Sequence, residues 1–178
     1  MFLGFAACDS KPPCRLEPGG LCSEQTFIDT KLRAKELMKI DLTKAVLNHA
    51  DFSNSDLTDS NLSEASMLNV TFTSAKLGNV TFDGADLSGS GFRESTLTKA
   101  SFKKANVRGA DFSKADLTGA DFTNANAQGI DLTDAVLDGT NFTGATLETG
   151  LIKGAKWVNV RCPDGQVSSK PCAQTKKP

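Results

Sequence analysis

Apolar residues, all of them large except Ala127, recur at every fifth position from Phe27 to Trp157, with no insertion or deletion. The stretch from Ala110 to Asn126 shows the unit most plainly: a small residue, then Asp or Asn, then a large apolar residue, which we call the centre of the unit. A spacing of five does not match the 3.6-residue period of an α-helix. The period therefore predicts a series of short, equivalent non-helical units.

Each unit places two residues in the interior. Residues two apart on an extended chain point to the same side, so the small residue and the centre face inward while the Asp or Asn between them faces out. The next inward residue comes three places later, so each unit must contain a corner. Glycine two places after many centres suits a corner with positive φ.

The order of the centres predicts four sides per coil. From Phe72 to Phe122, Phe alternates strictly with a smaller aliphatic residue, and only an even number of sides keeps the stacked columns pure. A flattened two-sided coil leaves little room for two facing Phe columns, so we expect four units and twenty residues per coil. The predicted columns are Phe52, Phe72, Phe92 and Phe112; opposite them Phe82, Phe102, Phe122 and Phe142; then Leu57, Leu77, Leu97, Leu117, Leu137 and Trp157; and lastly Leu47, Met67, Leu87, Val107, Ala127 and Leu147.

The units A-D-F-S-K, A-D-L-T-G and A-N-V-R-G resemble the pentapeptide-repeat family, whose pattern is A-(D/N)-L-x-x. The resemblance covers residues 25–159. It implies an all-β fold, a right-handed quadrilateral β-helix of about six to seven coils. Residues 1–24 are then a signal remnant, tether and cysteine loop, and residues 160–178 a C-terminal cysteine loop and polar tail.

All five cysteines lie outside the repeats. Cys14 and Cys22 enclose a Pro-Gly-Gly turn, and Cys162 and Cys172 enclose a Pro-Asp-Gly turn, so we expect one disulfide at each end. Other pairings stay open. A zinc site is the alternative, but the chain has one histidine and no Cys-x-x-Cys pair.

The first residues, ending in Ala6-Ala7-Cys8, resemble the end of a bacterial lipoprotein signal peptide. This implies that Cys8 is the lipid-modified N-terminus of the mature protein; a short lead with a free thiol is the alternative. A lipid on Cys8 would be the only membrane contact. With the terminal cysteines, it predicts a periplasmic or cell-envelope protein.

Charge bears on the possible partners. Some family members imitate B-DNA and bind DNA gyrase, but residues 25–159 hold seventeen acidic and fourteen basic side chains, an excess of only three negative charges. Duplex DNA carries one charge per roughly 1.7 Å, so a DNA mimic is disfavoured and no nucleic-acid partner is expected. A basic cluster is expected in the middle of the rod: Lys99, Lys103, Lys104, Arg108 and Lys114.

No catalytic, cofactor or metal constellation stands out. The outward aspartates recur because the repeat requires a small polar residue there: Asp51, Asp56, Asp86, Asp111, Asp116, Asp121 and Asp131. His49 is expected on the surface. The sequence favours a non-catalytic scaffold or protein-interaction rod, monomeric or dimeric end to end, with an unidentified protein partner. An enzyme with an unrecognised surface site is the alternative from another class, and no motif supports it.

Overall fold

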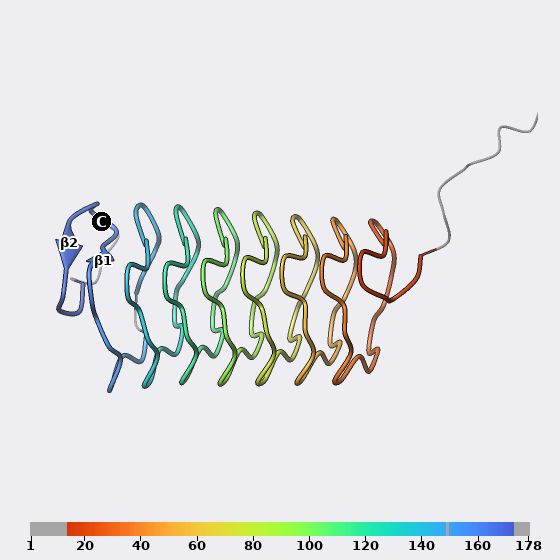
Figure 1. Ribbon diagram of the computed structural model, residues 1–178. Coiled ribbons are helices and arrows are strands. Elements are labelled where there is room, and N and C mark those ends of the chain that lie inside the picture. The colour runs from red at the N-terminus through yellow and green to blue at the C-terminus, as the bar shows by residue number, and fades with distance from the viewer. Residues whose placement is uncertain (1–13, 149, 173–178) are drawn as a thin grey trace, which may run out of the picture.

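The computed structural model describes residues 14–148 and 150–172, which form a rod of stacked coils (Figure 1). Parallel bridges join each rung to the residue twenty positions later, from Leu21 with Asp41 through Asn141 with Arg161. A twenty-residue coil contains four five-residue units, so the predicted four-sided coil is confirmed. The chain forms a right-handed quadrilateral β-helix.

We number the sides by the residues at their centres. Side 1 contains Phe102, side 2 Val107, side 3 Phe92 and side 4 Leu97. Each side of a coil bonds to the same side of the coils before and after it. On side 3, for example, the Phe92 amide donates to the Asp111 carbonyl at 2.6 Å, and the Asp111 amide donates to the Ser90 carbonyl at 3.0 Å. Every rung is therefore held on both edges except at the two ends of the rod.

The interior consists of the four columns of centres. The stacked Phe rings are parallel within a column, with centroids 5.0 Å apart for Phe72 and Phe92 and 4.9 Å apart for Phe82 and Phe102. Rings of the two columns meet edge to face, as Phe92 and Phe102 do at 5.9 Å. The structure buries the centres of the four predicted columns, including Trp157, which is 8% exposed at the last coil, whereas Phe27 is only partly buried. Bulky Ile40, Val70, Val80 and Ile130, which stand where the repeat has a small residue, are also fully buried.

The corners are left-handed whether or not they contain glycine. Gly109 and Gly129 have positive φ, as expected, but so do His49 (φ 61°), Lys99 (φ 57°) and even Ala34 (φ 51°). The corner conformation is therefore set by the coil. A non-glycine residue accepts the strain because the backbone bonds on either side fix the turn.

Both ends carry a disulfide, Cys14–Cys22 and Cys162–Cys172, which confirms the expected pairing. Cys22 and Cys162 are themselves centres in the column of side 1 and lie one coil beyond Leu42 and Phe142. The bridge ladder thus begins before residue 25 and continues past residue 159. After the last coil, β1 (Val160–Arg161) and β2 (Val167–Ser168) pair antiparallel. Among the described residues no helix is long and apolar enough to span a membrane.

Candidate interaction surfaces

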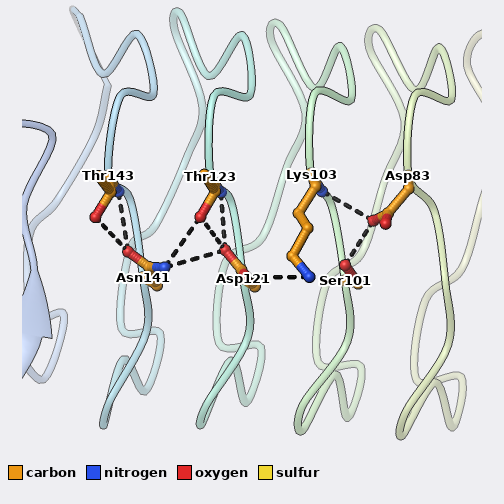
Figure 2. Close-up of polar contacts among 7 residues, drawn as sticks. All are labelled: Asp83, Ser101, Lys103, Asp121, Thr123, Asn141 and Thr143. Atoms are coloured by element: carbon orange, nitrogen blue, oxygen red, sulfur yellow. Dashed lines mark hydrogen bonds and ion pairs between the residues drawn. The ribbon is translucent and has the colours of Figure 1, made fainter.

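The outer sides are covered by repeated short hydrogen-bond pairs. The side chain of the Asp or Asn before a centre accepts from the amide two residues later, and commonly from its hydroxyl as well. Figure 2 shows this at Asp121, which accepts from the Thr123 amide at 2.9 Å, and at Asn141, which accepts from the Thr143 amide at 3.0 Å. The Asn141 side-chain amide also donates to Asp121 at 3.2 Å, so neighbouring coils are linked. These contacts give the outward Asp a structural role.

Two of these aspartates have perturbed acidity. Partial burial raises the pKa of Asp56, but hydrogen bonds from the Thr58 hydroxyl and amide and from Lys76 outweigh it, so the pKa lies below its ordinary value. The pKa of Asp51 is lowered in the same way, with Ser53 and Arg33 as donors against the effect of burial. Both carboxylates are held as anions, which suits hydrogen-bond acceptors and not general acids.

The structure does not assemble the candidate catalytic residues. Each of the seven outward aspartates accepts a hydrogen bond from the Ser or Thr two residues later. His49 lies at a corner of side 2 and is exposed, as expected. No group of three or more His, Cys, Asp or Glu within the described ranges is placed to hold a metal ion.

The basic cluster expected mid-rod is distributed around the coil. Lys99 follows the side 4 centre, Lys103 and Lys104 follow the side 1 centre, Arg108 lies on side 2 and Lys114 on side 3. Lys103 and Lys114 are also paired, with Asp121 at 3.5 Å and Glu94 at 3.6 Å. The cluster therefore does not form one basic face.

A shallow polar hollow of about 260 Å³ lies on side 2, floored by Gly109 and Gly129 and edged by Arg108, Gln128 and Glu148. It exists because two stacked corners carry no side chain. Gln128 donates to Glu148 at 3.4 Å across its edge.

Two family models match the repeat. One, described as a pentapeptide repeat region, covers residues 75–156; the other, described as pentapeptide repeats in eight copies, matches residues 26–59, 36–73 and 50–89. Together they span the coils seen in the structure. The chain belongs to the pentapeptide-repeat family.

Solved structures of pentapeptide-repeat proteins share the fold. A protein from the Arabidopsis thaliana thylakoid lumen is 36% identical with a TM-score of 0.50; the match covers 51% of this chain and 63% of that one, so less than two thirds of the relative's length is matched. QnrB1, a plasmid-mediated fluoroquinolone resistance protein, is 18% identical with a TM-score of 0.50, over 74% of this chain and 76% of its own. At that identity QnrB1 shows the fold alone. Among curated proteins there is no significant match.

The surface of this pentapeptide-repeat protein departs most from its repeat at the C-terminal end. Leu151 stands where the repeat has a small polar residue and is 61% exposed, and Val158 nearby is 43% exposed. The inward residues Ile152 and Ala155 are only partly buried, although Leu132 and Ala135 one coil earlier are fully buried. Sequence reasoning missed this end, although the signal was present, because Leu151 interrupts an outward column that contains Asp111 and Asp131.

Proposed function

We propose that this pentapeptide-repeat protein is a non-catalytic interaction rod of the bacterial cell envelope, anchored by a lipid on Cys8. The observation that carries the proposal is the position of the disulfides. Cys22 and Cys162 occupy the first and last interior places of the side 1 column, where other coils have Leu or Phe. Buried cysteines in those places serve a protein that matures in an oxidising compartment.

The form of the rod supports a role in interaction. The seven outward aspartates are occupied by structural hydrogen bonds, and the described residues assemble no catalytic or metal-binding group. Repeat arrays form extended surfaces that bind partners. The thylakoid-lumen relative is also a protein of a membrane-bounded compartment, which agrees with a location outside the cytosol.

Location and anchor are tested together. The natural gene, expressed in its own host, should yield a membrane-fraction protein that incorporates radiolabelled palmitate. Cys8→Ser should abolish the label and release the rod in soluble form, with both disulfides intact by peptide mapping. Cys8 lies outside the described residues and belongs to neither disulfide. A cytosolic protein with reduced cysteines would overturn the proposal.

The interaction role is tested by photo-crosslinking in the same host. A photoreactive residue placed at Asp29, Lys99, Gln128 or Lys153 samples both ends and two sides of the rod. We expect a discrete crosslinked protein from at least one position. The enzyme alternative gains support only from a reproducible activity that survives purification. The DNA-mimic alternative requires protection of gyrase against a quinolone in a supercoiling assay, and we expect none.

A further inference from the structure

The C-terminal end of the rod is an incomplete coil. The hairpin of β1 and β2 continues side 1: the Arg161 amide donates to the Thr140 carbonyl at 2.9 Å, and β2 covers the outer edge of β1 (Figure 1). Among residues 14–148 and 150–172, none covers sides 3 and 4 in this way. One coil earlier the Leu132 and Leu137 amides donate to the Leu151 and Lys156 carbonyls at 2.7 and 3.0 Å.

No described residue continues this pattern at the last rung. Within the described residues, the Ile152 and Trp157 amides have no acceptor, and the Gly150 and Ala155 carbonyls accept no hydrogen bond. An edge of this kind is a template for another extended segment.

The core at that edge also contains an unpaired hydrogen-bond donor and a small pocket. The Trp157 indole nitrogen Nε1 is buried and has no hydrogen-bond partner within the described part of the chain. Trp157 lines a small apolar pocket of about 10 Å³ together with Gly150, Ile152 and Cys172. A buried donor without a partner is costly, so an acceptor brought to this end would be stabilised.

Charge distinguishes this end from the body of the rod. Residues 150–172 carry four basic side chains, Lys153, Lys156, Arg161 and Lys170, against one acid, Asp164. Residues 41–149 carry fifteen acids and eight bases. All four basic residues are exposed, and in the described ranges none has a carboxylate within ion-pair distance. The end is therefore a basic pole on a rod with an acidic body.

We propose that the C-terminal end binds an extended, acidic segment of a partner protein, which adds a rung to the open edge on sides 3 and 4. The segment's carbonyls accept from the Ile152 and Trp157 amides, and its own amides donate to the Gly150 and Ala155 carbonyls. Because side chains alternate along an extended segment, an apolar residue covers Trp157 while the preceding acidic residue lies over Lys156. This proposal rests on the proposed interaction role and names its surface and the chemistry of its partner.

The charges argue against a second copy as the occupant. Two C-terminal ends placed together would bring two basic poles into contact. The N-terminal end, residues 14–40, has five bases and four acids, so it offers no acidic complement. An anionic membrane surface would satisfy the lysines but would leave the Ile152 and Trp157 amides without ordered acceptors.

Trp157, the only tryptophan, reports on binding from within the edge. The probe is a fluorescein-labelled decapeptide with the five-residue spacing of the rod, Glu-Val-Glu-Gly-Ala repeated twice. It is compared with a counterpart that has lysine in place of glutamate and with a glutamate version N-methylated at alternate peptide bonds. We expect the first peptide to bind, to shift Trp157 emission, and to weaken as salt is raised. The other two should bind at least about tenfold more weakly.

Matched variants locate the site. Lys153→Glu/Lys156→Glu should weaken binding of the acidic peptide at least about tenfold. Lys99→Glu/Lys104→Glu makes the same change of charge on exposed mid-rod residues and should leave binding unchanged. Circular dichroism melting should show both variants folded.

Four outcomes would overturn the proposal. The first two are that the methylated peptide binds as tightly as the unmethylated one, or that the mid-rod variant loses as much peptide affinity as Lys153→Glu/Lys156→Glu. The other two are sedimentation with phosphatidylglycerol vesicles that depends on Lys153 and Lys156 in the absence of peptide binding, and dimerisation through this end, detected by light scattering. A photo-crosslink at Lys99 or Gln128 with no peptide binding would defeat this inference and leave the interaction rod standing. Absence of any crosslinked partner would defeat both.

Discussion

The carboxylate of Asp83 accepts a hydrogen bond from the backbone amide of Lys103, one coil further along, at 3.0 Å (Figure 2). In many units the corresponding amide donates to a side chain of its own coil, as the Thr123 amide does to Asp121. Lys103 is preceded by Ser101 in place of Asp, so the acceptor comes from the coil before. Asn48 does the same for the Leu68 amide, also at 3.0 Å. The amide directly after a centre can therefore donate to a side chain of its own coil or to one of the coil before.

Asp83→Ala should therefore destabilise the rod, by roughly 1–2 kcal/mol, because the Lys103 amide and the Ser101 hydroxyl lose their acceptor. Urea denaturation followed by circular dichroism measures the change. Ser101→Asp in the Asp83→Ala background restores an acceptor at the usual place and should recover most of the loss. Failure of this rescue would show that Asp83 acts through some other contact.

The interior of the rod could be predicted from the sequence almost completely, whereas its exceptions could not. The inward residues repeat at a fixed interval, so the Phe alternation, with the room that two facing Phe columns need, predicted four sides. Asp83 and Asn48 stand directly after a centre, where many other units have Ser or Thr. Their role is not visible in the sequence, because the groups that donate to them lie eighteen to twenty residues away. The basic residues from Lys99 to Lys114 are close in sequence, but five-residue units turn them to different sides.

Substitution of Phe102 should reduce stability more than substitution of Phe142, which lies in the same core column. The Phe102 ring stacks on Phe82 and Phe122 at 4.9 and 4.5 Å and meets Phe92 and Phe112 edge to face, whereas the Phe142 ring contacts only Phe122 among the described aromatic residues. We expect Phe102→Ala to cost about 3–5 kcal/mol and Phe142→Ala less. Urea denaturation of both variants gives the comparison, and equal losses would show that ring contacts add little.

Acid should weaken the rod through Asp51 and Asp56. Their pKa values are lowered in the folded state, so they add stability above the ordinary Asp pKa, and this contribution is lost as pH falls through the lowered value. Unfolding free energy measured between pH 6 and pH 3 should therefore decrease, with the fall concentrated below about pH 4.

The control is Asp56→Asn. Asn61 and Asn141 accept the same two hydrogen bonds from Ser63 and Thr143, so asparagine preserves the pairing while removing the titrating group. The variant should show a shallower pH dependence. An unchanged slope would assign the acid sensitivity elsewhere.

Removal of the Cys162–Cys172 disulfide should loosen the C-terminal end before the rest. Closing this loop is worth roughly 2–4 kcal/mol, but repeats contact only their neighbours, so the loss should appear locally. In Cys162→Ser/Cys172→Ser, Trp157 fluorescence should change at lower urea than the circular dichroism signal. Cys14→Ser/Cys22→Ser, at the far end, should leave the Trp157 transition in place. Coincident transitions in the first variant would mean that the rod unfolds as one unit.

Ala127 is the smallest centre in the array, and a larger residue at this position tests whether the core around it is already filled. Ala127 is fully buried in the side 2 column between Val107 and Leu147, and Ile130, bulky for its position, lies in the same coil. We expect Ala127→Leu to be neutral or stabilising in thermal melting, because leucine restores the volume usual for this column. Ala125→Leu makes the same change two residues earlier, at a position where the repeat needs a small side chain, and should destabilise. If Ala127→Leu also lowers the melting temperature clearly, Ile130 already fills the layer and the small centre is compensated within its own coil.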